Sequence, residues 1–132
     1  LEKVNFSGSD LSESKINGMH SNLSGANLSG ANLKRSNLSW SCMVNVNLSD
    51  SDLSDTSLIS TDFTCAKLVN SNLENSNLRN SNLLNADLSN ANLLNANLDS
   101  AYMRGAIIST EQLKLVKSYT NATLPNGVKN KK

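Results

Sequence analysis

The sequence predicts an all-β solenoid that ends in a short capping α-helix. Three observations carry this prediction. A large apolar residue, usually Leu, recurs every five residues; the residue two places before it is small; and the residue two places after it is often Gly or Asn. A period of five fits neither the 3.6 residues of a helical turn nor the alternation of a simple strand. A fixed short period is typical of stacked repeat units instead.

The large apolar residues form a spine that runs without a slip through 18 consecutive repeats. The residue two places before the spine is Ala, Ser or Thr in 17 of these repeats, Val46 being the exception, and the residue just before the spine is Asn or Asp in 13. The predicted core spine is Leu23, Leu28, Leu33, Leu38, Met43, Leu48, Leu53, Leu58, Phe63, Leu68, Leu73, Leu78, Leu83, Leu88, Leu93, Leu98, Met103 and Ile108.

The N-terminal residues follow the same rule in a shifted frame, with spine residues at Leu1, Phe6, Leu11 and Ile16. Seven positions then separate Ile16 from Leu23, so two residues are inserted. We place them in a bulge at one corner, Asn17–His20. Because Leu1 already occupies a spine position, we expect that the solenoid can continue upstream in the natural protein.

Side-chain alternation explains why five residues suffice for one repeat. The spine residue and the residue two places before it both point inward, and the second must be small to leave room for the first. The remaining residues point outward or turn the corner. The position two places after the spine supplies residues that tolerate left-handed backbone. They are Gly25, Gly30, Asn45, Asn70, Asn75, Asn80, Asn85, Asn90, Asn95 and Gly105.

This pattern resembles the pentapeptide-repeat family, whose consensus is A(D/N)LXX. Residues 26–30 (Ala-Asn-Leu-Ser-Gly) and 31–33 (Ala-Asn-Leu) match the consensus outright. The resemblance covers residues 1–108 and implies a right-handed quadrilateral β-helix with one repeat per side. Residues one coil apart then stack at about 4.8 Å. One side would hold Leu23, Met43, Phe63, Leu83 and Met103.

The C-terminal residues break the period and are predicted to cap the solenoid. Ser109 with Gln112 fits a capping box, and Glu111–Tyr119 is predicted as a short helix. Ala122–Leu124 reads as a last degenerate repeat, closed by the turn residues 125–127. The inward residues of the helix are expected to be Leu113, Leu115, Val116 and Tyr119.

A cap of this kind would cover apolar interior and unpaired strand edges. The helix and the Ala-Thr-Leu-Pro-Asn-Gly segment resemble the closing segment of cyanobacterial and chloroplast family members. The predicted organisation is therefore a β-helix over 1–108, a helix and cap over 109–127, and a disordered tail over 128–132.

The titratable and nucleophilic residues form no pattern that predicts catalysis, a metal site or a cofactor. His20 lies in the bulge without a nucleophile or carboxylate near it in sequence, and Cys42 and Cys65 are expected to be unpaired thiols. The one acidic cluster lacks the ligand spacing of a cation-binding loop, so we expect a solvated acidic face. Its residues are Asp50, Asp52, Asp55 and Asp62.

Three apolar residues at outward positions are the candidates for a partner site: Trp40, Val44 and Ile59. The main interpretation is a non-catalytic structural or interaction protein, a rigid β-helix that presents flat faces to an unidentified protein partner. With 12 Lys and Arg against 11 Asp and Glu, the chain has no cationic surface for nucleic acid, and no segment is apolar enough to insert into a membrane.

The resemblance adds an alternative, a DNA mimic that binds DNA gyrase. That role requires a strongly negative surface, whereas residues 23–108 carry seven acidic and five basic residues. A third hypothesis, ice binding by a flat face, would need a Thr ladder that Thr56, Thr61 and Thr64 do not form. We expect a monomer, with an end-to-end dimer through the C-terminal helix as the alternative. The cytoplasm, the periplasm and the thylakoid lumen all stay open as locations.

Overall fold

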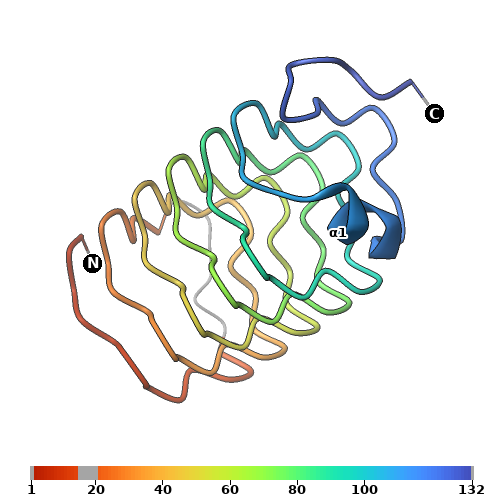
Figure 1. Cartoon of the computed structure of the whole chain (residues 1–132). Coiled ribbons are helices and arrows are strands. Elements are labelled where there is room, and N and C mark those ends of the chain that lie inside the picture. The colour runs from red at the N-terminus through yellow and green to blue at the C-terminus, as the bar shows by residue number, and fades with distance from the viewer. Residues whose placement is uncertain (1, 15–20, 132) are drawn as a thin grey trace.

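The protein is a stack of coils wound about one axis, as the computed structural model of residues 2–14 and 21–131 shows (Figure 1). Each coil pairs with the next in parallel; Asn27 bridges Asn47, and Asn47 in turn bridges Lys67. This register of twenty residues corresponds to four five-residue repeats per coil. The N-terminal and C-terminal residues lie at opposite ends of the stack.

Each repeat forms one side of a coil, so residues one coil apart share a side. Spine side chains from Leu23 to Met103 are at most 1% exposed, whereas Ile108, near the end of the stack, is only partly buried. We number the sides by their spine residues. Side 1 contains Leu23, Met43, Phe63, Leu83 and Met103; side 2 contains Leu28, Leu48, Leu68, Leu88 and Ile108; side 3 contains Leu33, Leu53, Leu73 and Leu93; side 4 contains Leu38, Leu58, Leu78 and Leu98.

The walls of the coils are too short for multi-residue strands. Each repeat spends two residues in a turn, and the residue just before the spine makes the bridge to the next coil. Within the described residues the pairing therefore consists of isolated bridges, and the helix is α1 (Thr110–Leu115). The predicted all-β character holds for the pairing of the walls, but the described residues form no multi-residue strand.

Left-handed backbone at every corner turns the chain. The N–H of the small residue donates to the spine carbonyl, as from Ala26 to Leu23 at 3.0 Å, which closes a four-residue turn. The third residue of this turn, Gly25, has φ +67°, as a type II turn requires. Residues other than Gly and Asn occupy the same conformation, among them Arg35 and Trp40.

The Asn or Asp before each spine residue stabilises the following turn. Its Oδ1 accepts a hydrogen bond from the backbone N–H two residues further on. Asn22 accepts the N–H of Ser24 at 3.0 Å, and Asp52 accepts the N–H of Ser54 at 2.9 Å. These residues therefore have a structural role in addition to their outward position, which explains their frequency in the repeat.

The first coil pairs in a register of 22, because Asn5 bridges Asn27 and Asp10 bridges Asn32. The next bridge, from Asn22 to Cys42, returns to the register of 20. The first coil thus contains the two additional residues that the spine spacing predicts. The proposed bulge at Asn17–His20, with His20 itself, lies outside the described residues.

α1 begins with the predicted capping box. Ser109 Oγ accepts the N–H of Gln112 at 3.1 Å, and Gln112 Oε1 accepts the N–H of Ser109 at 2.9 Å. The helix ends at Leu115, however, so the prediction of a helix over Glu111–Tyr119 is too long. Leu115 is 49% exposed and does not face inward as expected, whereas Leu113 packs against the core.

Long-range backbone pairing ends the helix. Val116 is extended, and the two residues after it rejoin the wall of side 4. The N–H of Lys117 donates to the carbonyl of Ala96 at 2.8 Å, and the N–H of Leu98 donates to the carbonyl of Ser118 at 2.7 Å. Lys117 and Ser118 thus stand together opposite one residue of the preceding coil, which is a β-bulge.

The last residues fold back over the final coil. Thr123 bridges Tyr102 in parallel and Lys129 in antiparallel orientation, and the N–H of Asn130 donates to the carbonyl of Ala122 at 2.7 Å. Residues 128–130 are therefore paired with neighbouring backbone, whereas the sequence predicts a disordered tail over 128–132. Backbone groups left free at the edge of the last coil pair with this segment, which covers part of that edge.

Candidate functional site

Trp40 and Ile59 lie at the same corner of adjacent coils, the corner that follows side 4. The N–H of Trp40 donates to the carbonyl of Ile59 at 2.9 Å. Trp40 is 60% exposed and Ile59 is half-buried. Val44, the third apolar candidate, is half-buried in the next turn of the coil, one side further along. The structure therefore brings together two of the three predicted partner residues.

The backbone at Trp40 is in an unfavourable region for a bulky residue. Its φ is +65°, a left-handed value that costs an ordinary side chain about 1 kcal/mol or more. Asn80, two coils further along the same corner, has φ +56° and is the kind of residue that tolerates this conformation. Local folding therefore does not favour Trp at position 40.

Arg79 extends the same corner by one coil. The N–H of Ser60 donates to the carbonyl of Arg79 at 2.9 Å, so Arg79 follows Ile59 along the stack. The side chain of Arg79 is exposed and takes part in none of the ion pairs between described residues. An aromatic, an aliphatic and a cationic residue thus line one edge of side 4, a combination that is common at interface hot spots.

Asp99 follows Arg79 on this corner but is occupied by the C-terminal segment. Its Oδ1 accepts a hydrogen bond from the Ser118 hydroxyl and another from the Thr120 N–H at 2.9 Å. The Ser118 hydroxyl above all, with smaller help from Arg79, holds the pKa of this carboxyl below its usual value of 3.8.

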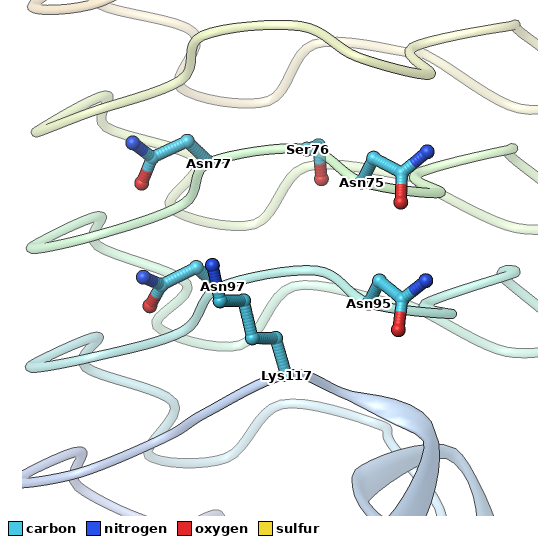
Figure 2. A pocket seen from close by; sticks show the side chains of 6 residues that line it. All are labelled: Asn75, Ser76, Asn77, Asn95, Asn97 and Lys117. Carbon is cyan, nitrogen blue, oxygen red and sulfur yellow. The ribbon is translucent and has the colours of Figure 1, made fainter.

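A polar groove lies on side 4 at the C-terminal end of the stack (Figure 2). Two rows of Asn side chains flank it, and Lys117 extends into it from the last coil. Lys117 occurs in none of the ion pairs of the described residues. We call this the side 4 groove; its lining residues are Asn75, Ser76, Asn77, Asn95, Asn97 and Lys117.

The amides of this groove are unlike those of the neighbouring side. On side 3, Asn92 Nδ2 donates to Asn72 Oδ1 at 3.0 Å, and Asn72 Nδ2 donates to Asp52 Oδ1 at 3.2 Å. The corresponding ladder is absent between Asn97 and Asn77, two described residues of side 4. The Asn77 side chain accepts the N–H of Arg79, and the Asn97 side chain accepts the N–H of Asp99 and interacts with the Asp99 carboxylate. The sequence does not reveal this difference, since both sides read as Asn-rich.

The other predicted candidates form no site in the described residues. Cys42 and Cys65 are free thiols, Cys42 half-buried and Cys65 exposed. The acidic residues interact with neighbours instead of gathering: Asp50 accepts a hydrogen bond from Asn70, and Asp55 accepts one from Asn75 and forms an ion pair with Lys34. Across residues 2–14 and 21–131, no three His, Cys, Asp or Glu side chains lie close enough together to hold a metal ion. Within the same residues, no helix is long and apolar enough to cross a membrane.

A model of pentapeptide repeats matches residues 20–50, 41–80 and 71–109. The chain belongs to the pentapeptide-repeat family. Members of this family fold as right-handed quadrilateral β-helices, which agrees with the four-sided coils described above. The predicted family and solenoid architecture are therefore confirmed.

Solved structures of family members are similar to this chain. HetL, a protein involved in heterocyst differentiation regulation from the cyanobacterium Nostoc, is 27% identical with a TM-score of 0.65; the match covers 98% of this chain and 65% of HetL. A pentapeptide repeat protein of the Arabidopsis thaliana thylakoid lumen is 22% identical with a TM-score of 0.62, over 90% of this chain and 77% of that one.

Rfr23 from the cyanobacterium Cyanothece is 28% identical with a TM-score of 0.51, over 94% of this chain and 86% of Rfr23. No curated protein sequence matched the chain. The pentapeptide-repeat chain thus spans slightly less than two thirds of HetL, and the likeness to these structures establishes its fold.

Proposed function

We propose that this pentapeptide-repeat chain is a non-catalytic interaction module that binds another protein through side 4 and the corner that follows it. The observation that carries the proposal is Trp40, which is 60% exposed on backbone that disfavours it. Local folding would favour Asn or Gly at this position, so the presence of Trp supports a role in binding. Trp is also the residue type most enriched among interface hot spots, together with Tyr and Arg.

The regularity of the fold supports the same role. The stack is held by backbone pairing at every side, so outward side chains are displayed on a rigid surface. A rigid surface loses little conformational entropy when a partner binds. HetL, a family member of similar fold, is involved in heterocyst differentiation regulation.

A DNA-mimic role at gyrase is the less favoured reading. The column of bridging residues on side 3 is mostly Asn, whose amide is neutral, and the column on side 2 includes Lys67 and Ile107, so neither side carries a continuous row of carboxylates. Similarity to QnrB1, a plasmid-mediated fluoroquinolone resistance protein, is at 18% identity and concerns the fold. A supercoiling assay with purified gyrase separates the two roles, since a DNA mimic would inhibit or protect the enzyme at stoichiometric protein.

The test of the interaction role compares three immobilised forms of the chain in an extract of the source organism. We expect one or more proteins to be retained by the wild type and lost on the Trp40→Ser, Ile59→Ser double variant. Ile107→Ser is the control, because Ile107 is 57% exposed on side 2. Proteins retained equally by all three forms, or none retained by any, would contradict the proposal, as would turnover of a substrate by the pure chain.

A further inference from the structure

We infer that the side 4 groove binds the carboxylates of an extended acidic segment of a partner protein. This inference rests on the interaction function proposed above and names the chemistry of the partner. It is drawn from the hydrogen-bonding groups that the groove leaves unused, from the position of Lys117, and from the charge along the adjoining corner.

The groove offers donors without acceptors. Asn77 Oδ1 accepts the N–H of Arg79 at 3.3 Å, and Asn97 Oδ1 accepts the N–H of Asp99 at 2.9 Å. These backbone bonds fix the orientation of both amides, because only the oxygen can accept. The Nδ2 groups of Asn77 and Asn95 have no partner among the described residues, whereas the side chain of Asn97 also interacts with the Asp99 carboxylate.

A carboxylate is the group that best fits such a set of donors. It accepts several hydrogen bonds at its two oxygens, and bonds from an ammonium to a carboxylate are about twice as strong as neutral ones. Lys117 supplies that ammonium beside Asn97 (Figure 2). No acidic residue lines the groove to compete with a ligand.

The β-bulge places Lys117 on this wall. In a regular coil a single residue would stand opposite Asn97, and here Ser118 makes that bridge while Lys117 is the additional residue. Bulges commonly redirect a side chain next to a functional site. The bulge therefore gives side 4 a cation at a wall position that carries Asn or Ser in the preceding coils.

An extended segment, more than a small free carboxylate, fits the spread of the binding groups. Lys117 and Trp40 are separated by four coil steps, or about 19 Å at the spacing of paired strands. About six residues of extended peptide span that length. Such a segment can place acidic side chains at Lys117 and Arg79 and an apolar side chain at Trp40 and Ile59.

Asp99, the carboxylate nearest this path, interacts with Arg79 only weakly. Its oxygen is engaged by Ser118 and Thr120, and it forms no ion pair with Arg79 in the described residues. Neither Arg79 nor Lys117 is held in an ion pair among the described residues, so both can pair with a partner. The complementary charge of that partner is negative.

The test selects peptides from a random twelve-residue display library on the immobilised full chain. We expect the selected peptides to be enriched in Asp and Glu and to carry an apolar residue. Their affinity should fall at least about tenfold on Lys117→Ala with Arg79→Ala, since the peptide loses its charge-assisted hydrogen bonds. Lys67→Ala is the matched control, because Lys67 is an exposed lysine at the equivalent wall position of side 2.

Two further measurements locate the binding. Trp40 is the single Trp of the chain, so a Trp-free peptide should change the Trp emission on binding. The side-chain amide resonances of Asn77, Asn95 and Asn97 should shift with the peptide, and free glutamate should shift them only weakly.

Three outcomes would overturn the inference: an empty selection, selected peptides without acidic enrichment, and peptides that bind the Lys117→Ala, Arg79→Ala variant as well as the wild type. If a partner protein is still lost on the Trp40 and Ile59 double variant while the cation variant retains it, the interaction function stands and the acidic partner is excluded. If both variants still retain the partner protein, the interaction function and the acidic partner are both rejected.

Discussion

The side-chain amide of Gln112 donates to the main-chain carbonyl of Ala91 at 2.9 Å, where the earlier coils of side 3 use a backbone N–H. In those coils the donor is the backbone N–H of the residue just before the spine. The N–H of Asn92, for example, donates to the carbonyl of Ser71 at 2.9 Å. Gln112 occupies the same place in the register, but its own N–H is bonded to Ser109 inside the capping box. The same amide also donates to the carbonyl of Leu88 at 2.7 Å.

We therefore expect Gln112→Ala to destabilise the C-terminal cap. The change leaves the carbonyl of Ala91 without its donor and removes half of the capping box, at a cost of about 1–3 kcal/mol. Urea denaturation followed by circular dichroism measures the loss. Glu111→Ala is the control, since Glu111 is exposed and pairs only with Lys114 on the surface. Equal stability of the two variants would show that the side-chain bond to the preceding coil contributes little.

Trp40→Asn should stabilise the fold by about 0.5–1 kcal/mol, because Asn tolerates positive φ and the Trp side chain is mostly exposed. The reverse change at the same corner, Asn80→Trp, should destabilise by a similar amount. Chemical denaturation of both variants checks the pair. A loss of stability in Trp40→Asn would mean that the contact of Trp40 with its neighbours outweighs the backbone strain, and would weaken the argument that this residue is retained for binding.

Phe63 is the largest side chain of the core and is fully buried on side 1. Phe63→Ala should destabilise by about 3–5 kcal/mol, because the cavity cannot collapse between rigid coils. Phe63→Leu restores the residue type of the regular spine and should cost far less. Thermal unfolding of both variants tests this. If the two variants unfold at the same temperature, the solenoid adjusts its coils more readily than the continuous backbone pairing implies.

The spine, the corners and the number of residues per coil could be predicted because each inward or turning position imposes its own residue type. Leu73 and Ser71 are both buried. The sequence reveals the spine position by its large apolar residue and the other inward position by its small residue. The sequence does not reveal that the Asn or Asp before the spine bonds to the following turn. An outward polar residue looks the same in sequence whether or not its side chain accepts a turn N–H.

The predicted helix is too long for a physical reason. Local propensity favours a helix through Tyr119, but the free backbone groups of Ala96 and Leu98 capture Lys117 and Ser118. The side 4 groove escaped prediction for the same cause, because Lys117 reaches that wall only through the bulge. The candidate partner residues Trp40 and Ile59 could be named from the sequence, since both are apolar at outward positions.

Acid should weaken the C-terminal cap through Asp99. The Ser118 hydroxyl lowers the pKa of this carboxyl below 3.8, so the folded state binds the proton less readily than the unfolded state. The resulting stabilisation is present above the unfolded pKa and is lost as the pH falls from about 3.8 through the folded pKa. Ser118→Ala should flatten this acid-induced loss in a plot of unfolding midpoint against pH. An unchanged slope would show that other carboxylates dominate acid unfolding.

The covered C-terminal end leads us to expect a monomer in solution. Residues 128–130 pair with the edge of the last coil, and α1 packs Leu113 against the core, so little unpaired edge is left there for a second copy. Light scattering after size-exclusion chromatography should give a mass near 14.2 kDa. Twice that mass would indicate the end-to-end dimer. In that case Leu115→Ser should restore the monomer, because Leu115 is 49% exposed on α1, whereas Ile107→Ser on side 2 should not.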